Sequence, residues 1–362
     1  MNLSALNLLN NTLDEVSPNP IGERLLQLKS SDIDERIEAF DKLRLLPADQ
    51  LEAGFHQYRK KSPSPGWEID CLERLEIEPP DPPINCERCI CTVVSPGYET
   101  MLEALLDTLN AYGQCPEARI VVFTIGDSFD TLAHRTDITR IRCRAIERLS
   151  PAVKGAIYSA ARFINSRYFL SLEADMLVVG NLQPFWAALE IAHPGLIMGV
   201  RPTGPNDQFS FVGSIVYAGS RASDVEFLTG DADFNCPYWI NGGVIAGDKA
   251  AFESLNAQLL KLAPKSILWL EGGSTVTFND ESLMNLCLGL QNNAVELGWN
   301  YNQMFYTADR KQWIQTAKTP DGFRYFQRGA PSKILHFIST GRKLMWEVKA
   351  ELDEEGLAPT EV

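Results

Sequence analysis

The chain has 362 residues, of which 45% are hydrophobic, and it carries a formal net charge of −14 at pH 7. A chain of this length can bury one large α/β core with appended elements, or it can form two domains. The negative charge excludes a general nucleic-acid binder, which needs a broad basic surface, but it leaves room for a nucleotide held by a few local cations.

The first part of the chain is predicted to be helical. An apolar helical stripe begins after Ser31 and is ended by Pro47, and a second stripe follows. The proline-rich segments 62–66 and 79–83 predict linkers. We therefore assign residues 1–85 to a helical N-terminal extension, which either decorates the main domain or binds a partner.

The sequence offers no signal for export or membrane insertion. No stretch approaches the ~20 apolar residues of a membrane span. The start of the chain has neither the basic segment nor the cleavage site of a secretory signal. We expect a cytoplasmic protein without a transmembrane segment, and peripheral membrane attachment stays open.

Three of the eight cysteines, Cys86, Cys89 and Cys91, cluster where the first strand of the main domain is expected. Such a cluster suggests a zinc or iron–sulfur site, but the usual second Cys-x-x-Cys pair is missing. Cys91 lies within an apolar run, where a free cysteine behaves as a small core residue. We expect reduced and mostly buried thiols.

From Cys89 onward, predicted strands and helices alternate. Their boundaries, in chain order, are strand 89–94, a helix ending at Gly113, strand 119–125, a helix from Ser150 with the stripe Val153, Ile157, Ala161 and Ile164, strand 168–172, possible strands 196–200, 211–217 and 243–246, helices 248–262 and 280–290, and strand 333–337. This alternation predicts an α/β fold with a mostly parallel, mixed sheet flanked by helices. We assign residues 86–348 to this domain and 349–362 to a charged tail.

Two carboxylates, Glu173 and Asp175, follow the strand 168–172. Residues i and i+2 of an extended backbone point to the same face, and open α/β sheets bind ligands beyond the carboxyl ends of their strands. Neighbouring carboxylates repel unless a cation lies between them, and oxygen ligands suit Mg²⁺ or Mn²⁺. The pair therefore predicts a metal-bridged, phosphate-bearing substrate, and the alternative is a solvated turn.

Four segments, taken together, resemble the motifs of nucleotide-sugar glycosyltransferases with the GT-A fold, most closely the retaining family 8 with its glycogenin and galactosyltransferase relatives. The resemblance covers roughly residues 89–346. The segments are Leu172-Glu173-Ala174-Asp175-Met176, similar to the family's D-x-D strand end, Asn241-Gly242-Gly243-Val244, Asp280-Glu281-Ser282-Leu283-Met284-Asn285, and Leu335-His336-Phe337 followed by Gly341 and Trp346.

The resemblance implies a role for each matched residue. Glu173, Asp175 and His336 would bind Mn²⁺, or Mg²⁺, which holds the diphosphate. Asp280 and Glu281 would touch the transferred sugar and its reacting face. The matched residues Lys154, Asn241 and Gly243, with its neighbour Gly242, would contact the donor. Apart from the matched motifs, Arg342 and Lys343 are cations that could neutralise the diphosphate, with Lys343 an approximate substitute for the family lysine, and Tyr98, just after the first predicted strand, is a candidate stacking partner for the nucleobase. Without the resemblance, Lys154 would be interpreted as an exposed helix lysine and His336 as a core histidine.

The sequence also departs from the family pattern in three places. Glu173 replaces the first Asp of the triplet, Glu281 stands where the family has Gln, and the segment from His336 to Trp346 is two residues longer than expected. Leu344-Met345 replaces the family's Lys-Pro pair. These departures are consistent with a different donor, a divergent subgroup or lost activity.

The resulting functional hypothesis is a cytosolic, bacterial-type glycosyltransferase. It would move a hexose from a nucleotide diphosphate sugar, with UDP-hexoses favoured, to a hydroxyl of a glycan, lipid or protein acceptor. A retaining reaction needs no separate base, whereas an inverting one would use Asp280 or Glu281. Aromatic residues Tyr238, Trp239 and Trp269 form either an acceptor platform or part of the core.

Two alternatives from other classes stay open. One is a non-catalytic binding or scaffold protein that keeps the GT-A core and acts through its N-terminal helices. The other is a sugar nucleotidyltransferase, which usually has a Gly-rich loop with a cation after its first strand. The loop 95–99 has one glycine and no cation, which counts against that class.

Overall fold

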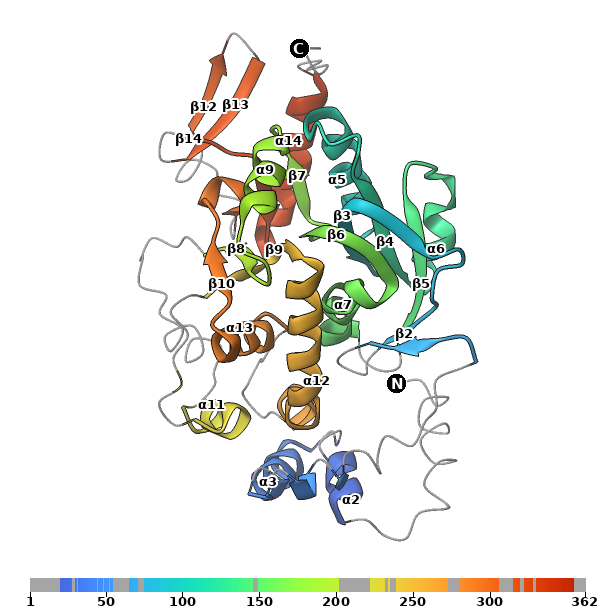
Figure 1. Cartoon of the computed structure of the whole chain (residues 1–362), viewed down its shortest axis with the longest axis vertical. Helices are drawn as coiled ribbons and strands as arrows, with labels where there is room; N and C mark the ends of the chain where they lie inside the picture. The colour runs from blue at the N-terminus through green and yellow to red at the C-terminus, as the bar shows by residue number, and fades with distance from the viewer. Residues whose placement is uncertain are drawn as a thin grey trace.

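The computed structural model describes most of the main domain and part of the N-terminal region (Figure 1). The described residues are 20–27, 30, 32–43, 45–47, 49–51, 53–54, 65–70, 75–145, 149–201, 222–231, 234, 239–272, 280–305, 315–319, 322–327 and 330–354. Several predicted features lie outside them: most of the second apolar stripe of the N-terminal region, including Phe55 and Tyr58, the strand 211–217, Tyr238, and the side chains of Val153, Trp269 and Asp280.

A nine-stranded mixed sheet forms the centre of the molecule, with strand order β1-β2-β5-β4-β3-β6-β9-β8-β10. All of its strands except β2 and β9 run in the same direction. Their bounds are β1 Glu68–Ile69, β2 Leu75–Ile77, β3 Ile84–Val94, β4 Arg119–Ile125, β5 Thr139–Ala145, β6 Ile164–Leu172, β8 Ile197–Val200, β9 Asn241–Asp248 and β10 Ala294–Glu296. The prediction of a mostly parallel, mixed sheet is confirmed.

The remaining described strands form two small sheets. The first has the order β11-β15-β7, formed by Gln303–Phe305, Ile334–Phe337 and Met176–Val178. The second consists of β12 Gln315–Thr319, β13 Gly322–Gln327 and β14 Ala330–Pro331, and it projects at one end of the molecule (Figure 1). The predicted strand 333–337 is therefore present, but β15 pairs antiparallel with β7 outside the main sheet.

Helices flank the central sheet. Their bounds are α5 Glu99–Tyr112, α6 Ser128–Thr131, α7 Leu149–Tyr158, α8 Ala160–Phe163, α9 Gln183–Ile191, α11 Ala222–Thr229, α12 Lys249–Gly272, α13 Asp280–Gln291 and α14 Arg342–Glu354, with short 3-10 turns at Leu132–His134, Trp299–Tyr301 and Ser339–Gly341. The central strands are covered on both faces, since every residue of β3 from Cys89 to Val94 is buried. Among the described helices, none combines the length and apolar character needed to cross a membrane.

The structure corrects three predicted boundaries. Ile164 was assigned to the stripe of the helix before the acidic pair, but α8 ends at Phe163 and Ile164 begins β6 without an intervening loop. The helix predicted to end near Leu262 continues to Gly272, with Pro264 inside it. Residues 349–354, assigned to the charged tail, continue α14 because Leu352 packs into the core.

Strand β5 is absent from the sequence-based prediction. Three arginines, Arg140, Arg142 and Arg144, alternate with Ile141 and Cys143 along it. In the structure the guanidinium groups of Arg140 and Arg142 lie 4.5 and 4.0 Å from the centre of the Phe129 ring. Arginine side chains that stack on aromatic rings can line a packed strand.

The N-terminal helices α2 (Pro20–Gln27) and α3 (Ile33–Leu43) lie beside α12 at one end of the molecule (Figure 1). Their apolar faces, which include Leu25, Phe40 and Leu43, belong to the same core cluster as the main sheet. This packing favours the role of a decoration over that of a separate module. Strands β1 and β2, within the segment assigned to the extension, pair with the main sheet through β5.

The described cysteines are free, as predicted. Cys89, Cys91, Cys143 and Cys287 are buried, and Cys86 and Cys115 are partly buried. No metal-binding group that includes a cysteine occurs in the part of the chain that the structure describes.

Cys86 should be the most reactive of these thiols. It lines a cavity of about 560 Å³ at the amino ends of β3 and β6. A hydrogen bond from Cys89 lowers the pKa of the Cys86 thiol to about 7 against the opposing effect of burial, whereas burial raises the pKa of Cys115 to about 11. Because the thiolate is the nucleophile, a short iodoacetamide pulse should label Cys86 first, with a rate that rises with pH around 7. Peptide mass spectrometry across a pH series measures this, and earlier labelling of Cys115 would contradict it.

Candidate functional site

Three chain segments meet at the carboxyl end of β6. Glu173 directly follows this strand, Asp175 precedes β7, and His336 lies on β15, opposite Met176 of β7. Backbone hydrogen bonds fix their relative positions: the Glu173 N–H donates to the Gly243 carbonyl at 3.1 Å, and the Phe337 N–H donates to the Asp175 carbonyl at 2.9 Å. The site thus lies where a mostly parallel sheet is expected to bind its ligand.

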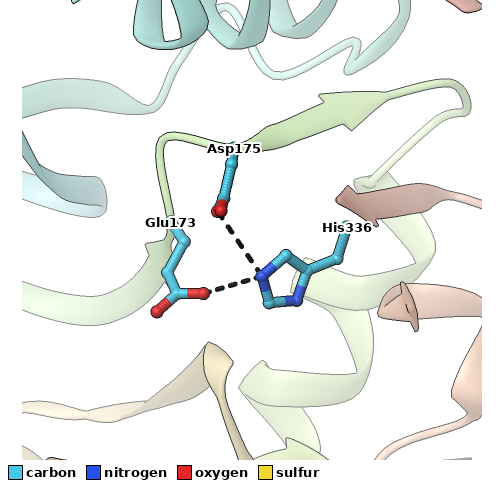
Figure 2. A group of neighbouring side chains, drawn as sticks. All are labelled: Glu173, Asp175 and His336. Atoms are coloured by element: carbon cyan, nitrogen blue, oxygen red, sulfur yellow. Dashed lines mark ion pairs between the residues drawn. The ribbon is translucent and has the colours of Figure 1, made fainter. Parts of the chain in front are cut away.

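Glu173, Asp175 and His336 point toward one another (Figure 2). The Nε2 atom of His336 lies 2.7 Å from Oε2 of Glu173 and 3.5 Å from Oδ1 of Asp175. The three ligand atoms all lie within 4.8 Å of one another. Each of these two distances is shorter than the combined length of two metal–ligand bonds of roughly 2.1 Å each. One cation could therefore bind between these atoms in place of their direct contacts. Two carboxylates and one imidazole form a donor set that fits Mn²⁺ or another divalent ion.

Two cations hold the outer oxygens of these carboxylates. Lys154 of α7 forms an ion pair with Oε1 of Glu173 and donates to the Gly242 carbonyl at 3.0 Å. Arg342, the first residue of α14, donates from Nε to Oδ2 of Asp175 at 2.9 Å. A cation between the inner oxygens and His336 would leave both of these pairs intact. Lys154 is only 7% exposed, so it is not an ordinary surface lysine.

The charges of the cluster shift the pKa values of His336 and Glu173. Burial favours neutral His336, but the hydrogen bonds and negative charges of Asp175 and Glu173 outweigh burial and raise the pKa of His336 to about 9. Burial likewise opposes ionisation of Glu173, yet Lys154 and His336 lower the pKa of that carboxyl well below its usual range. The Glu173 carboxylate is therefore ionised near neutral pH, and a metal ion at Nε2 of His336 would displace a proton.

Tyr98 and Lys343 differ in their relation to this cluster. The Tyr98 hydroxyl accepts a hydrogen bond from Nη1 of Arg342 at 3.0 Å, and the Arg342 guanidinium lies 5.1 Å from the centre of the Tyr98 ring. Lys343 is exposed on α14, and within the described residues it has no ion pair or hydrogen bond to the cluster. The structure brings Tyr98 to the site and leaves Lys343 at the surface.

The carboxylate of Glu281 is held by three N–H donors. Its Oε2 accepts from Nδ2 of Asn241 at 2.9 Å and from the Gly242 N–H at 3.0 Å, and its Oε1 accepts from Nε1 of Trp239 at 2.5 Å. Trp239 is buried, so it belongs to the core rather than to an exposed platform. A Cβ atom on Gly242 would lie 3.8 Å from both Glu281 Oε2 and Lys154 Nζ, which places Gly242 between an anion and a cation.

Gly243 makes room for a protein side chain. A Cβ atom at this position would lie 2.4 Å from Cε1 and 2.7 Å from Nδ1 of the His336 ring. The sequence suggested that this glycine lets the backbone approach a donor sugar. In the structure the His336 ring lies against this glycine, and its role toward a donor sugar stays a prediction.

Two buried asparagines support the site. Asn285 ends the matched segment 280–285 but had no role assigned to it, and Asn302 was not identified from the sequence. Asn285 accepts from the Ile240 N–H at 2.7 Å and donates to the Ile240 carbonyl at 2.8 Å, which fixes the chain just before β9. Asn302 bridges Asn241 and His336. The helical spacing of Asn285 after Glu281 was a usable signal, whereas Asn302 lies in a polar segment that resembles an ordinary turn.

Glu281→Gln should destabilise the fold. The hydrogen bonds that Trp239, Asn241 and Gly242 make to the Glu281 carboxylate all come from N–H donors, so the amide group of glutamine would place an N–H against another N–H. We expect a loss of about 1–3 kcal/mol in the free energy of unfolding, measured by urea denaturation. The matched substitution Glu347→Gln, at an exposed position of α14, should change it by less than about 0.5 kcal/mol. Equal stability of the two variants would contradict the hydrogen-bond assignment.

Neither a protein-family model nor a curated protein sequence matches the chain. Among solved structures, the galactosyltransferase LgtC in complex with donor and acceptor sugar analogues is similar with 14% identity and a TM-score of 0.45, over 76% of this chain and 97% of that one. The apo-form glycosyltransferase GlyE of Streptococcus pneumoniae has 15% identity and a TM-score of 0.44, over 76% of this chain and 66% of that one. Mouse xyloside xylosyltransferase 1 has 11% identity and a TM-score of 0.42, over 70% of this chain and 98% of that one.

The three similar structures are glycosyltransferases by name. Their sequence identities of 15% or less and TM-scores below 0.5 assign no activity to this chain. The functional argument therefore rests on the side chains of the site.

Proposed function

We propose that the chain is a metal-dependent glycosyltransferase that moves a hexose from a UDP-sugar to an acceptor hydroxyl with retention of configuration. The observation that carries the proposal is the triad of Glu173, Asp175 and His336, in which Asp175 and His336 are buried and Glu173 is partly buried, with Lys154 and Arg342 on its outer oxygens. The motifs that contain these residues resemble those of GT-A glycosyltransferases, which is the second support.

The charge of the cluster suits a nucleoside diphosphate. Glu173 and Asp175 supply two negative charges, and Lys154 and Arg342 supply two positive ones. Glu173, Asp175 and His336 would hold a divalent ion, whose Lewis acidity would stabilise the negative charge of the departing diphosphate. Arg342 would hold phosphate oxygens beside the triad, and Tyr98, which Arg342 contacts, would meet the nucleobase.

The charges of Lys154 and Glu281, on either side of Gly242, favour this position for the transferred sugar. This glycine lies between the Lys154 ammonium and the Glu281 carboxylate. A fixed carboxylate near the anomeric carbon stabilises the positive charge that develops as the glycosidic bond breaks. Because the lone pairs of Glu281 are engaged by three donors, it is better suited to this electrostatic role than to accepting the acceptor proton. The leaving phosphate oxygen can take that proton in a front-face, retaining reaction.

The proposal is tested by UDP release from a panel of UDP-hexoses, with Mn²⁺ or with a chelator. We expect slow hydrolysis of one donor in the presence of Mn²⁺ and none with the chelator. Lys154→Met should lose this hydrolysis, whereas Lys249→Met, at a partly exposed lysine that pairs with Glu253, should keep it. Absence of UDP release with every donor would favour the binding-protein alternative.

A further inference from the structure

Asn302 is the buried link between the triad and the Glu281 carboxylate. It is 0% exposed and lies between the turn Trp299–Tyr301 and β11. Its Nδ2 donates to Oδ1 of Asn241 at 2.9 Å, and its Oδ1 lies 3.0 Å from Nδ1 of His336. Its backbone is held as well, since its N–H donates to the Trp299 carbonyl at 3.1 Å.

A series of hydrogen bonds runs from Glu281 through Asn241 and Asn302 to His336. The direction of each is set by groups that can only donate or only accept. Glu281 is a carboxylate that only accepts, so Asn241 must turn its Nδ2 toward it. The Gly243 N–H only donates, and it donates to Oδ1 of Asn241 at 3.0 Å. Both partners therefore orient Asn241 in the same way, with its oxygen toward Asn302.

The same reasoning extends to the histidine. Because Asn302 must present its Nδ2 to the oxygen of Asn241, its own oxygen faces His336. An oxygen only accepts, so Nδ1 of His336 must carry a proton. The other ring nitrogen, Nε2, then faces Glu173 and Asp175, and because Asn302 holds the proton on Nδ1, it is Nε2 that would give up its proton to a cation.

We propose that Asn302 is a positioning residue for metal binding, which holds the proton on Nδ1 of His336 and thereby directs Nε2 to the ion. The inference rests on the proposed function, since it requires a metal ion at the triad. Histidine ligands commonly donate their second N–H to such a partner, which fixes the ring and raises its basicity as a ligand. The parallel pairing of Met304 with His336 holds β11, and with it Asn302, beside the ring.

The first test is the affinity for Mn²⁺, measured from the electron paramagnetic resonance signal of the free ion at one fixed pH. Asn302→Leu keeps the size of the side chain but removes the acceptor, and it should weaken binding roughly 10–100-fold. Asn302→Asp keeps an acceptor for the Nδ1 proton but loses the donor to Asn241, so it should bind Mn²⁺ more tightly than Asn302→Leu does. The control Asn256→Leu, at a buried asparagine that donates to Ser159, should match the unsubstituted protein.

A second readout separates positioning from a general structural role. In protein labelled with ¹⁵N-histidine and loaded with the diamagnetic ion Zn²⁺, the His336 signal should show a proton on Nδ1 and the metal on Nε2. The opposite arrangement would overturn the inference, even if Asn302→Leu does not fold. Unchanged Mn²⁺ affinity in Asn302→Leu would also overturn it. Failure of the unsubstituted protein to bind any divalent ion would instead refute the proposed function.

Discussion

Asp175→Asn should abolish metal-dependent nucleotide binding while the protein stays folded. The substitution preserves the shape of a side chain that is 6% exposed, but it removes the negative charge that faces both His336 and Arg342. Loss of a direct ligand should cost more than the roughly 10–100-fold in metal affinity that is typical of an outer partner. We therefore expect Mn²⁺ affinity to fall by more than about a hundredfold in a calorimetric titration.

A matched variant separates this effect from the loss of an ion pair. Asp137 also pairs with an arginine, Arg135, through hydrogen bonds of 2.9 and 2.6 Å, and it lies just before β5. Asp137→Asn should leave Mn²⁺ affinity unchanged. Equal affinities in Asp175→Asn and in the unsubstituted protein would show that Asp175 is not a metal ligand.

Gly243→Ala should displace His336 from the triad. The added methyl group would lie 2.4 Å from Cε1 of His336 and 2.6 Å from Cε of Met176. The flexible methionine can move, but the histidine is enclosed by Asn302, Glu173 and Asp175. We expect loss of measurable Mn²⁺ binding and a decrease of about 1–3 kcal/mol in the free energy of unfolding.

The neighbouring glycine provides the control for this substitution. A methyl group on Gly242 would meet its nearest atoms at 3.8 Å, which is ordinary contact. Gly242→Ala should therefore keep the Mn²⁺ affinity and the free energy of unfolding close to those of the unsubstituted protein. A Gly243→Ala variant that binds Mn²⁺ as well as Gly242→Ala does would refute the placement of His336 against Gly243.

The sequence predicted those features whose signal is local. Glu173 and Asp175 could be placed at the end of a buried strand because the apolar run and the acidic pair are contiguous. The helix α5 and strand β4 were likewise predicted from periodicity and from the glycine that ends the helix. Lys154 and His336 were selected through a family resemblance, and the structure brings both to the acidic pair.

The remaining features depend on contacts between distant segments. Asn302 meets Asn241 and His336 across 61 and 34 residues of sequence, so no local pattern marks it. The close approach of Gly243 to His336 follows from the pairing of β15 with β7 and of β9 with β6. Strand β5 escaped prediction because its arginines stack on aromatic rings that precede it in the chain.

Calorimetric titration with UDP, in the presence and absence of Mn²⁺, tests the central claim most directly. The proposed site predicts UDP binding that requires Mn²⁺ in the unsubstituted protein and disappears in Asp175→Asn. Binding of UDP that is equally tight with a chelator, or no binding under either condition, would contradict a metal-held nucleoside diphosphate at Glu173, Asp175 and His336.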